Sequence, residues 1–263
     1  MSEQQPIRFD DGAAYEEMMG KWSRIAGEVF LDWLALPSGL RVLDIGCGNG
    51  AFTELLVARC APAEAQGVDP SVAQLEYARN RPGARSAQFR QGDAMALPFA
   101  DKHFDVATMA LVIFFVPDPK KGVAEMARVV KPGGLVCSYA WDIPGGGFPM
   151  EPIRAQMRAM GLPTINPPAV EASRMDALRG LWTGAGLERI ETKEITVQRT
   201  FASFDEFWAV NMKSASISAV LSKLTPDEIS RLKQGAGERL QAGAGGSVTG
   251  TGRANAIKGR VPR

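Results

Sequence analysis

The residues best suited to chemistry in this chain are an acid, Asp44, and the alternating glycines that follow it in the stretch Arg41-Val42-Leu43-Asp44-Ile45-Gly46-Cys47-Gly48-Asn49-Gly50. The apolar start is typical of a buried parallel strand. The glycines lack Cβ atoms, which lets the backbone turn tightly against a ligand. A helix opening at Ala51 would direct its free N–H groups into this loop. The pattern indicates a nucleotide site.

The neighbouring acids indicate which nucleotide is bound. Gly46-x-Gly48-x-x-Ala51 also fits the dinucleotide fingerprint G-x-G-x-x-G/A, so NAD is one alternative. Asp44, however, would repel a pyrophosphate and attract a ligand that carries an ammonium and a sulfonium. Asp69, 23 residues after Gly46, ends a second apolar stretch and can accept hydrogen bonds from ribose hydroxyls. These residues favour S-adenosylmethionine over NAD.

With these residues, the chain resembles the class I S-adenosylmethionine-dependent methyltransferases, and within them the type-11 methyltransferase domain family that includes quinone C-methyltransferases. The resemblance covers roughly residues 40 to 142 and rests on seven elements in order. They are Val42 to Gly50, Gly67 to Ser71, Gly92 to Ala94, Leu97 to Phe99, Phe104 to Val106, Val116 to Asp118 and Lys131 to Gly134. It implies a methyltransferase that uses S-adenosylmethionine, yields S-adenosylhomocysteine and needs no metal.

The spacing and the resemblance together place the cofactor on residues that follow the first strands and on the N-terminal helix. They are Asp44, Gly46, Cys47, Gly48, Asn49, Asp69, Pro70, Ser71, Asp93, Ala94, Leu111 and Trp22. The resemblance implies that Asp93 binds the adenine. In related enzymes an N-terminal helix closes over the methionine end of the cofactor. Tyr15, Trp22 or Ser23 would make that contact here, unless the helix serves only for packing.

Composition excludes several classes of partner. The chain has 263 residues, with 30 basic against 29 acidic side chains, which leaves no electrostatic footprint for nucleic acid or for an anionic membrane. Its three cysteines have no metal-ligand spacing and indicate reduced thiols in a cytosol. No apolar stretch is long enough to span a membrane. We expect a cytoplasmic protein with a small-molecule acceptor, and the sequence leaves the oligomeric state open.

The order of elements predicts an α/β fold, with a Rossmann-like doubly wound sheet of seven strands, mostly parallel, and an antiparallel last strand. The strands are expected at 41–45, 65–69, 86–91, 104–110, 135–142, 187–197 and 253–261, and helices at 13–35, 51–60, 71–80, 119–130, 204–222 and 226–241, with another around residue 180. We expect a single domain over residues 1–263. Its parts are a helical arm (1–36), a cofactor-binding core (37–142), a lid with helices (143–186) and last strands with a helical insertion (187–263).

Two glycine-rich segments are expected to be flexible. Residues 143–172 are bracketed by glycine and proline clusters and predict a mobile cover over the active site. Residues 243–252 predict a flexible turn before the last strand. The methionines of the cover, together with Phe114, Phe115, Trp141 and Phe148, favour an apolar or aromatic acceptor, whereas core packing is their commoner role.

Methyl transfer from a sulfonium depends chiefly on alignment in a dry pocket, so no catalytic side chain is required. The single histidine, His103, lies in a turn where we expect exposure to solvent. A general base would be Asp142, Glu151, Asp118 or Tyr139, and spacing favours none of them. The leading hypothesis is methyl transfer to an oxygen or carbon of a small molecule. The alternatives are a non-catalytic S-adenosylmethionine-binding protein and an NAD-dependent oxidoreductase.

Overall fold

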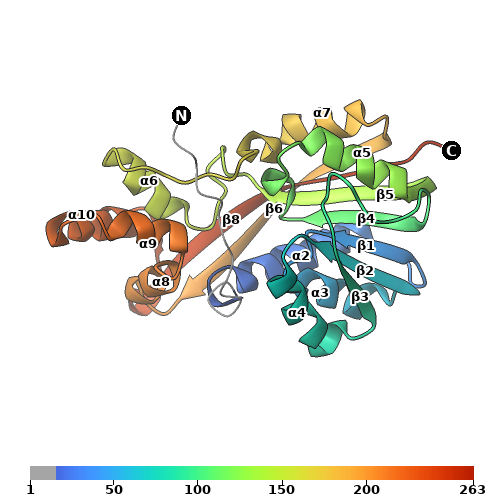
Figure 1. The fold of residues 1–263 in the computed structure, drawn as a ribbon. Helices are drawn as coiled ribbons and strands as arrows, with labels where there is room; N and C mark the ends of the chain where they lie inside the picture. The colour runs from blue at the N-terminus through green and yellow to red at the C-terminus, as the bar shows by residue number, and fades with distance from the viewer. Residues whose placement is uncertain (1–15) are drawn as a thin grey trace.

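The centre of the molecule is a mixed β-sheet (Figure 1). The structure is a computed structural model that describes residues 16–263. The strands follow the order β3-β2-β1-β4-β5-β8-β6, and a short strand, β7, pairs with β8. Their bounds are β1 Arg41–Ile45, β2 Glu64–Asp69, β3 Ala87–Gln91, β4 Phe104–Ala110, β5 Val130–Trp141, β6 Glu188–Phe201, β7 Gln241–Ala242 and β8 Val248–Arg260. The pairs among β1 to β5 are parallel, whereas β8 is antiparallel to β5 and β6. The prediction of a Rossmann-like, mostly parallel sheet with an antiparallel last strand is confirmed.

The strand order explains where a ligand can bind. β1 is central, and its apolar residues Val42, Leu43 and Ile45 are each at most 2% exposed because both faces of the strand are covered. The chain moves from β1 to β2 in one direction and from β3 back to β4 on the other side of β1. This reversal leaves a crevice at the carboxyl ends of β1 and β4, where parallel α/β sheets bind ligands.

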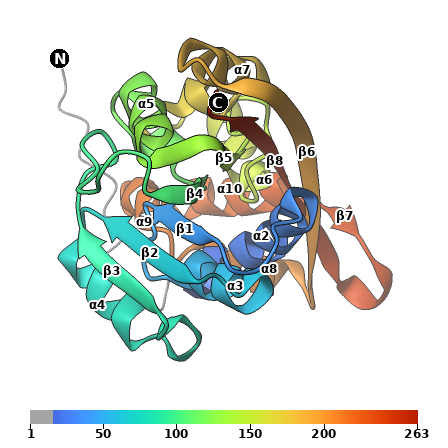
Figure 2. The same cartoon turned by 90° about the vertical axis from the view of Figure 1, so that its right-hand side faces the viewer.

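Helices cover both faces of the sheet (Figures 1 and 2). On one face lie α2 (Lys21–Leu34), α3 (Ala51–Cys60) and α4 (Val72–Asn80), and on the other lie α5 (Pro119–Val129) and α7 (Met175–Gly184). A π-helical turn, η1 (Glu16–Gly20), precedes α2, and the first residues of the predicted helix at 13–35 lie outside the described residues. Short 3-10 turns lie at η2 (Pro82–Ala84), η3 (Ile113–Phe115), η4 (Val170–Ser173) and η5 (Ala244–Gly246).

A long ribbon of β6 and β8 extends beyond the main sheet. These strands pair from Glu188 with Arg260 to Phe201 with Val248, whereas pairing of β5 with β8 ends at Trp141 with Ala254. Around the free end of the ribbon lie α6 (Glu151–Ala159), α8 (Phe204–Asn211), α9 (Ala215–Leu221) and α10 (Pro226–Gly237) (Figure 1). The helix predicted at 204–222 is therefore two helices, α8 and α9.

The glycines of β8 were predicted to form a flexible turn, and this prediction is wrong from Val248 onward. A Cβ atom on Gly250 would lie 3.3 Å from the Trp22 ring, and one on Gly252 would lie 3.0 Å from the Trp141 ring. Glycine is therefore used in this strand because two indole rings approach its backbone closely.

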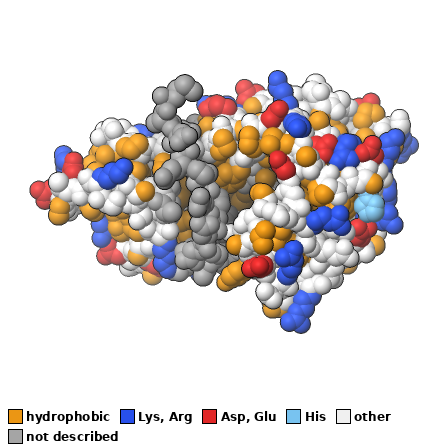
Figure 3. Space-filling model, in the orientation of Figure 1, with side chains coloured by type: hydrophobic (Ala, Val, Ile, Leu, Met, Phe, Trp, Pro, Cys, Tyr) orange, Lys and Arg blue, Asp and Glu red, His pale blue; other side chains and the backbone are white. Residues whose placement is uncertain are grey.

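Charges on the surface are mixed. Figure 3 shows basic and acidic side chains interspersed over one face of the molecule, which agrees with the near-zero net charge. None of the helices within residues 16–263 has the length and apolar character needed to cross a membrane.

Candidate active site

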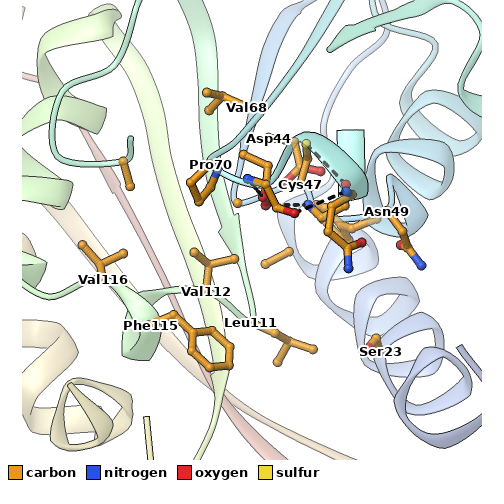
Figure 4. A pocket seen from close by; sticks show the side chains of 18 of the residues that line it. Ser23, Asp44, Cys47, Asn49, Val68, Pro70, Leu111, Val112, Phe115 and Val116 are labelled. Carbon is orange, nitrogen blue, oxygen red and sulfur yellow. Dashed lines mark hydrogen bonds between the residues drawn. The ribbon is translucent and has the colours of Figure 1, made fainter. Parts of the chain in front are cut away.

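A cavity of about 780 Å³ lies at the carboxyl ends of β1, β2 and β4 (Figure 4). This volume is within the usual range for small-molecule and cofactor sites. Its walls come from the loops after these strands, from the start of α2 and from residues 165–168. The polar side chains that line it are Ser23, Asp44, Asn49, Asp69, Ser71, Gln74, Asp93, Tyr139 and Asn166.

The glycine loop takes a shape that L-residues with side chains adopt rarely. Gly46, Gly48 and Gly50 have φ angles of 71°, 51° and 79°. A Cβ atom on Gly46 would lie 2.5 Å from a methyl carbon of Val112, whereas one on Gly48 would meet no atom closer than 4.0 Å. Gly46 is therefore required both for its backbone conformation and for close packing, and Gly48 for its conformation.

Asp69 fastens the glycine loop to the start of α4. One carboxylate oxygen accepts a hydrogen bond from the Gly48 N–H at 2.9 Å, and the other accepts one from the Ser71 N–H at 2.8 Å. Burial raises the pKa of Asp69, and these two hydrogen bonds oppose the rise. Each oxygen can accept a further hydrogen bond, so the carboxylate can also bind a ligand that enters the cavity.

Asp44 is the most deeply buried acid of the cavity, with 1% of its surface exposed. The Thr53 hydroxyl donates a hydrogen bond to Oδ2 at 2.6 Å, and Oδ1 has no partner among the described residues. The pKa of Asp44 is raised to about 7, chiefly because the carboxyl is buried; the hydrogen bond from Thr53 opposes the rise, and the nearby charge of Asp69 adds to it. An unpaired buried oxygen costs free energy, so a donor with positive charge would fit beside it.

The raised pKa of Asp44 predicts how stability depends on pH. The pKa of Asp44 in the folded state, about 7, lies above the ordinary value of 3.8. Between about pH 4 and pH 7 the Asp44 carboxyl therefore stays protonated to a greater extent in the folded protein than in the unfolded chain. The free energy of unfolding should therefore fall as pH rises from about 4 to 7, by at most roughly 1.4 kcal/mol per pH unit from this group. Urea unfolding of wild type and Asp44→Asn at several pH values checks this. A stability gap between the two proteins that stays constant with pH would contradict it.

The Ser23 side chain on α2 is the other buried polar group without a partner at the cavity wall. Its Oγ atom has none among the described residues, whereas its carbonyl oxygen accepts a hydrogen bond from the Tyr139 hydroxyl at 3.4 Å. Figure 4 shows Ser23 on the helix at the side of the cavity where Asn49 also lies. A ligand group at this end can therefore accept a hydrogen bond from Ser23.

Asp93 and Ala94 line the cavity on the loop after β3. Asp93 is exposed, and its Oδ1 accepts a hydrogen bond from the Met95 N–H at 2.8 Å. The rest of the loop is held by α5, because Arg128 donates to the carbonyls of Leu97 and Phe99. Neither Arg128 nor its ion-pair partner Glu125 was singled out from the sequence. They stand three residues apart on α5. This spacing is that of an ordinary ion pair on a helix surface, so the sequence does not show that Arg128 also binds the loop.

The other end of the cavity is apolar. It is lined by Leu111, Val112, Phe115, Val116, Pro117, Ile165 and Pro168. Leu111 adopts a φ of 62°, and its N–H donates to the Tyr139 carbonyl at 2.8 Å, which fixes the turn after β4. Figure 4 shows the Phe115 ring between Leu111 and Val116.

Several predicted contacts are not made at this cavity. All the predicted cofactor residues line it except Trp22. Trp22 is 1% exposed and its ring faces Gly250 of β8, whereas Ser23, one position further along α2, faces the cavity. Tyr15 lies outside the described residues. Phe114, Trp141, Met150 and Met157 are buried in the core, and Phe148 lies against it; none of the five lines the cavity.

The candidate general bases differ in their surroundings. Asp142 is paired with Arg253 at 2.7 Å, Glu151 is paired with Arg158, and Asp118 caps α5 through the Lys121 N–H. Of the four candidates, only Tyr139 lines the cavity.

His103 is remote from the cavity and was predicted to be exposed. It is instead half-buried, with Nε2 3.1 Å from a carboxylate oxygen of Glu64. Within residues 16–263, no three or more His, Cys, Asp or Glu side chains gather in a way that could hold a metal ion.

The sheet order and the cavity at the carboxyl ends of its strands are those of a Rossmann-like α/β fold. Residues 43–138 match the model of a protein family that is described as a methyltransferase domain. The match spans β1 to most of β5 and includes the glycine loop, Asp69 and Asp93. The segment that carries Ile165 and Pro168 lies outside it.

Curated relatives match part of the chain. A demethylmenaquinone methyltransferase of Desulfitobacterium hafniense is 42% identical over 105 residues, which are 38% of this chain and 42% of the relative. Another, of Renibacterium salmoninarum, is 34% identical over 145 residues, 55% of this chain and 57% of the relative. The matched segments thus span about half the length of these relatives.

Solved structures extend the likeness in fold to most of the chain. The YcgJ protein of Bacillus subtilis aligns with a TM-score of 0.60 and 19% identity, covering 91% of this chain and 99% of that protein. A phosphoethanolamine N-methyltransferase of Haemonchus contortus in complex with S-adenosylhomocysteine aligns with a TM-score of 0.59 and 20% identity, covering 97% of this chain and 58% of that one. The [4+2]-cyclase SpnF aligns with a TM-score of 0.56 and 18% identity, covering 99% of this chain and 87% of that one. One fold thus serves different reactions.

Proposed function

We propose that this chain binds S-adenosylmethionine in the cavity and transfers its methyl group to an oxygen or carbon atom of an apolar or aromatic small molecule. One observation carries the proposal. The acidic side chains that line the cavity are those of Asp44, Asp69 and Asp93, and no lysine or arginine of the described chain lines it. Such a site attracts a cationic adenosyl ligand.

The groups at the cavity wall fit the parts of this cofactor. Asp69 would accept hydrogen bonds from the ribose hydroxyls, and Asp93 with the neighbouring backbone would bind the adenine amine. The unpaired Oδ1 of Asp44 would face the ammonium, and the unpaired Oγ of Ser23 would donate to the carboxylate. When bound, the cofactor supplies an electrophilic methyl group on its sulfonium.

The apolar end of the cavity would hold the acceptor. Leu111, Val112 and Phe115 exclude water from the point where the acceptor meets the methyl group, and alignment of the reacting atoms provides most of the rate enhancement. Tyr139 also lines the cavity, but its hydroxyl donates to the Ser23 carbonyl on α2, so we assign no general base at the apolar end. The names of the curated relatives suggest quinone-type acceptors, but their matches cover about half of each relative. The acceptor is therefore proposed only as an apolar or aromatic small molecule.

The two alternative functions, NAD binding and non-catalytic binding of S-adenosylmethionine, have less support from the cavity. A dinucleotide would place its pyrophosphate on the glycine loop, beside Asp44 and Asp69, where the two carboxylates would repel it. A non-catalytic binding protein would have no use for the apolar end of the cavity. Incubation with methyl-labelled S-adenosylmethionine and a panel of phenols and other aromatic acceptors separates the two remaining hypotheses. Transfer of label to an acceptor supports the enzyme, and tight binding without transfer to any acceptor supports the binding protein.

Substitution of Asp69 tests the ribose contact. Asp69→Ala should lose roughly 1 to 3 kcal/mol of affinity for S-adenosylhomocysteine, because it removes a charged hydrogen-bond acceptor. The two amides that Asp69 holds, of Gly48 and Ser71, also lose their partner. Asp69→Asn is the matched control, since its amide oxygen can keep one of these bonds. Calorimetric titration of both variants measures the loss. Wild-type affinity in Asp69→Ala would overturn the ribose role.

A further inference from the structure

Arg154, on α6, is a buried cation with no anionic partner. Only 9% of its surface is exposed, and it forms no ion pair with any of residues 16–263. One terminal nitrogen donates to the Ile165 carbonyl at 3.1 Å, and the other donates to Oδ1 of Asn166. Its Nε is buried without a partner, and its guanidinium lies 5.6 Å from the centroid of the Phe148 ring. A buried arginine is normally paired with an acid, because desolvation of an unpaired charge is costly.

Arg154 lines a second cavity, of about 230 Å³, which we call the side cavity. The polar and charged side chains of its walls are Glu151, Arg154, Arg158, Thr164, Asn166 and Glu171. The other charges of these walls are already compensated. Glu151 is paired with Arg158, and Glu171 is paired with Arg174 at 2.6 Å. Arg154 is therefore the charged residue around the side cavity that forms no ion pair, although the charge of Glu151, three residues earlier on α6, acts on it from a greater distance.

The side cavity adjoins the apolar end of the main cavity. Asn166 lines both, and Ile165, whose carbonyl Arg154 binds, lines the main cavity. The main cavity has carboxylates and no lysine or arginine among its described lining residues. An acidic group on the acceptor would therefore be repelled there and attracted toward Arg154.

We propose that Arg154 binds an anionic group, a carboxylate or a phosphate, at one end of an acceptor whose apolar body lies against Leu111, Val112 and Phe115. Thr164 and Arg158 line the same cavity and can add hydrogen bonds to that group. Asn166 stands between the two cavities, with its Oδ1 held by Arg154 and its amide N–H groups available as donors. This proposal rests on the proposed function and narrows its acceptor to compounds with an acidic end.

Inorganic phosphate is the first probe. Ligands that bind only the folded state raise the unfolding temperature by mass action. In protein saturated with S-adenosylhomocysteine, phosphate at constant ionic strength should raise the unfolding temperature of wild type and not that of Arg154→Gln. Arg174→Gln is the matched control, because it removes a nearby arginine that is already paired and does not line the side cavity. Equal responses of wild type and Arg154→Gln, including no response in either, would overturn the proposal and leave Arg154 as an anchor for residues 165 and 166.

Matched acceptors then identify the group. Wild type loaded with S-adenosylhomocysteine should bind 4-hydroxyphenylacetate or phenyl phosphate about 10- to 150-fold more tightly than 4-hydroxyphenylacetamide, the range expected for a hydrogen-bonded charge. In Arg154→Gln the affinities for the acidic compounds and for the amide should differ by no more than about twofold, and Arg154→Lys should keep part of the preference for the acidic compounds. If S-adenosylhomocysteine binds and the acidic compounds have no advantage, the acceptor inference fails alone. If S-adenosylhomocysteine does not bind, the proposed function fails as well.

Discussion

Asp44→Asn should weaken binding of S-adenosylmethionine by roughly 2 to 5 kcal/mol, about 30-fold to several thousand-fold. The reason is the position of its carboxylate. Oδ1 is buried at the cavity wall without a partner, so a bound ammonium would form a charged hydrogen bond there in a site of low dielectric. An asparagine in this place either turns its own N–H₂ group toward the ammonium or presents a neutral oxygen. Calorimetric titration of the two proteins measures the difference.

Thr53→Val is the control for the Asp44 prediction. It removes the hydroxyl that donates to Oδ2 at 2.6 Å but leaves the carboxylate in place. The affinity should fall less than in Asp44→Asn, because the charge that faces the ligand remains. Asp44→Asn with wild-type affinity would show that this carboxylate does not contact the cofactor.

Gly46→Ala should cost roughly 2 to 5 kcal/mol in the free energy of unfolding. Two terms contribute. A left-handed φ of 71° is unfavourable for alanine by about 1 to 2 kcal/mol, and overpacking adds about 1 to 3 kcal/mol. The overpacking arises because the new Cβ atom would lie 2.5 Å and 2.6 Å from the two methyl carbons of Val112 and 3.1 Å from its Cβ. Rotation of the valine side chain cannot relieve all three contacts.

Gly48→Ala separates these two terms. Gly48 has a φ of 51°, and its added Cβ atom would meet no atom closer than 4.0 Å, so only the conformational cost applies. The double variant Gly46→Ala/Val112→Ala should lose less free energy of unfolding than the two single variants lose together, because the contact that causes the overpacking is absent from it. Urea unfolding of the four variants provides the cycle. If Gly46→Ala and Gly48→Ala lose the same free energy of unfolding, the contact with Val112 does not contribute to the loss at Gly46.

The parallel core was predictable because its signals are local in the sequence. The strand ending at Ile45, the glycines after it and the acid Asp69 each follow from a short stretch whose side-chain types fix burial or backbone shape. Helix starts also depend on local signals, as two capped helices show. The Ser71 side chain accepts from the Gln74 N–H, and the Thr225 and Glu228 side chains form a reciprocal capping box.

Other features depend on how distant segments pack. The choice between Trp22 and Ser23 required the rotation of α2 about its axis, which is set by the fit of Trp22 against Gly250, far away in the sequence. The glycines at the start of β8 are typical of a turn in sequence. Only the packing of the Trp22 and Trp141 rings against Gly250 and Gly252 explains their presence in a strand. Arg154 is one of many arginines in the sequence, and its burial under residues 165 and 166 appears only in the folded chain.

Binding of S-adenosylmethionine in the cavity beside Asp44 and Asp69 underlies every other role proposed for these residues. It can be measured by isothermal titration of the purified protein with S-adenosylmethionine, S-adenosylhomocysteine and NADH in parallel. We expect saturable binding of both adenosyl ligands and none of NADH, because the site has acidic walls where a pyrophosphate would lie. Binding of NADH alone, or of none of the three, would show that this cavity is not an S-adenosylmethionine site.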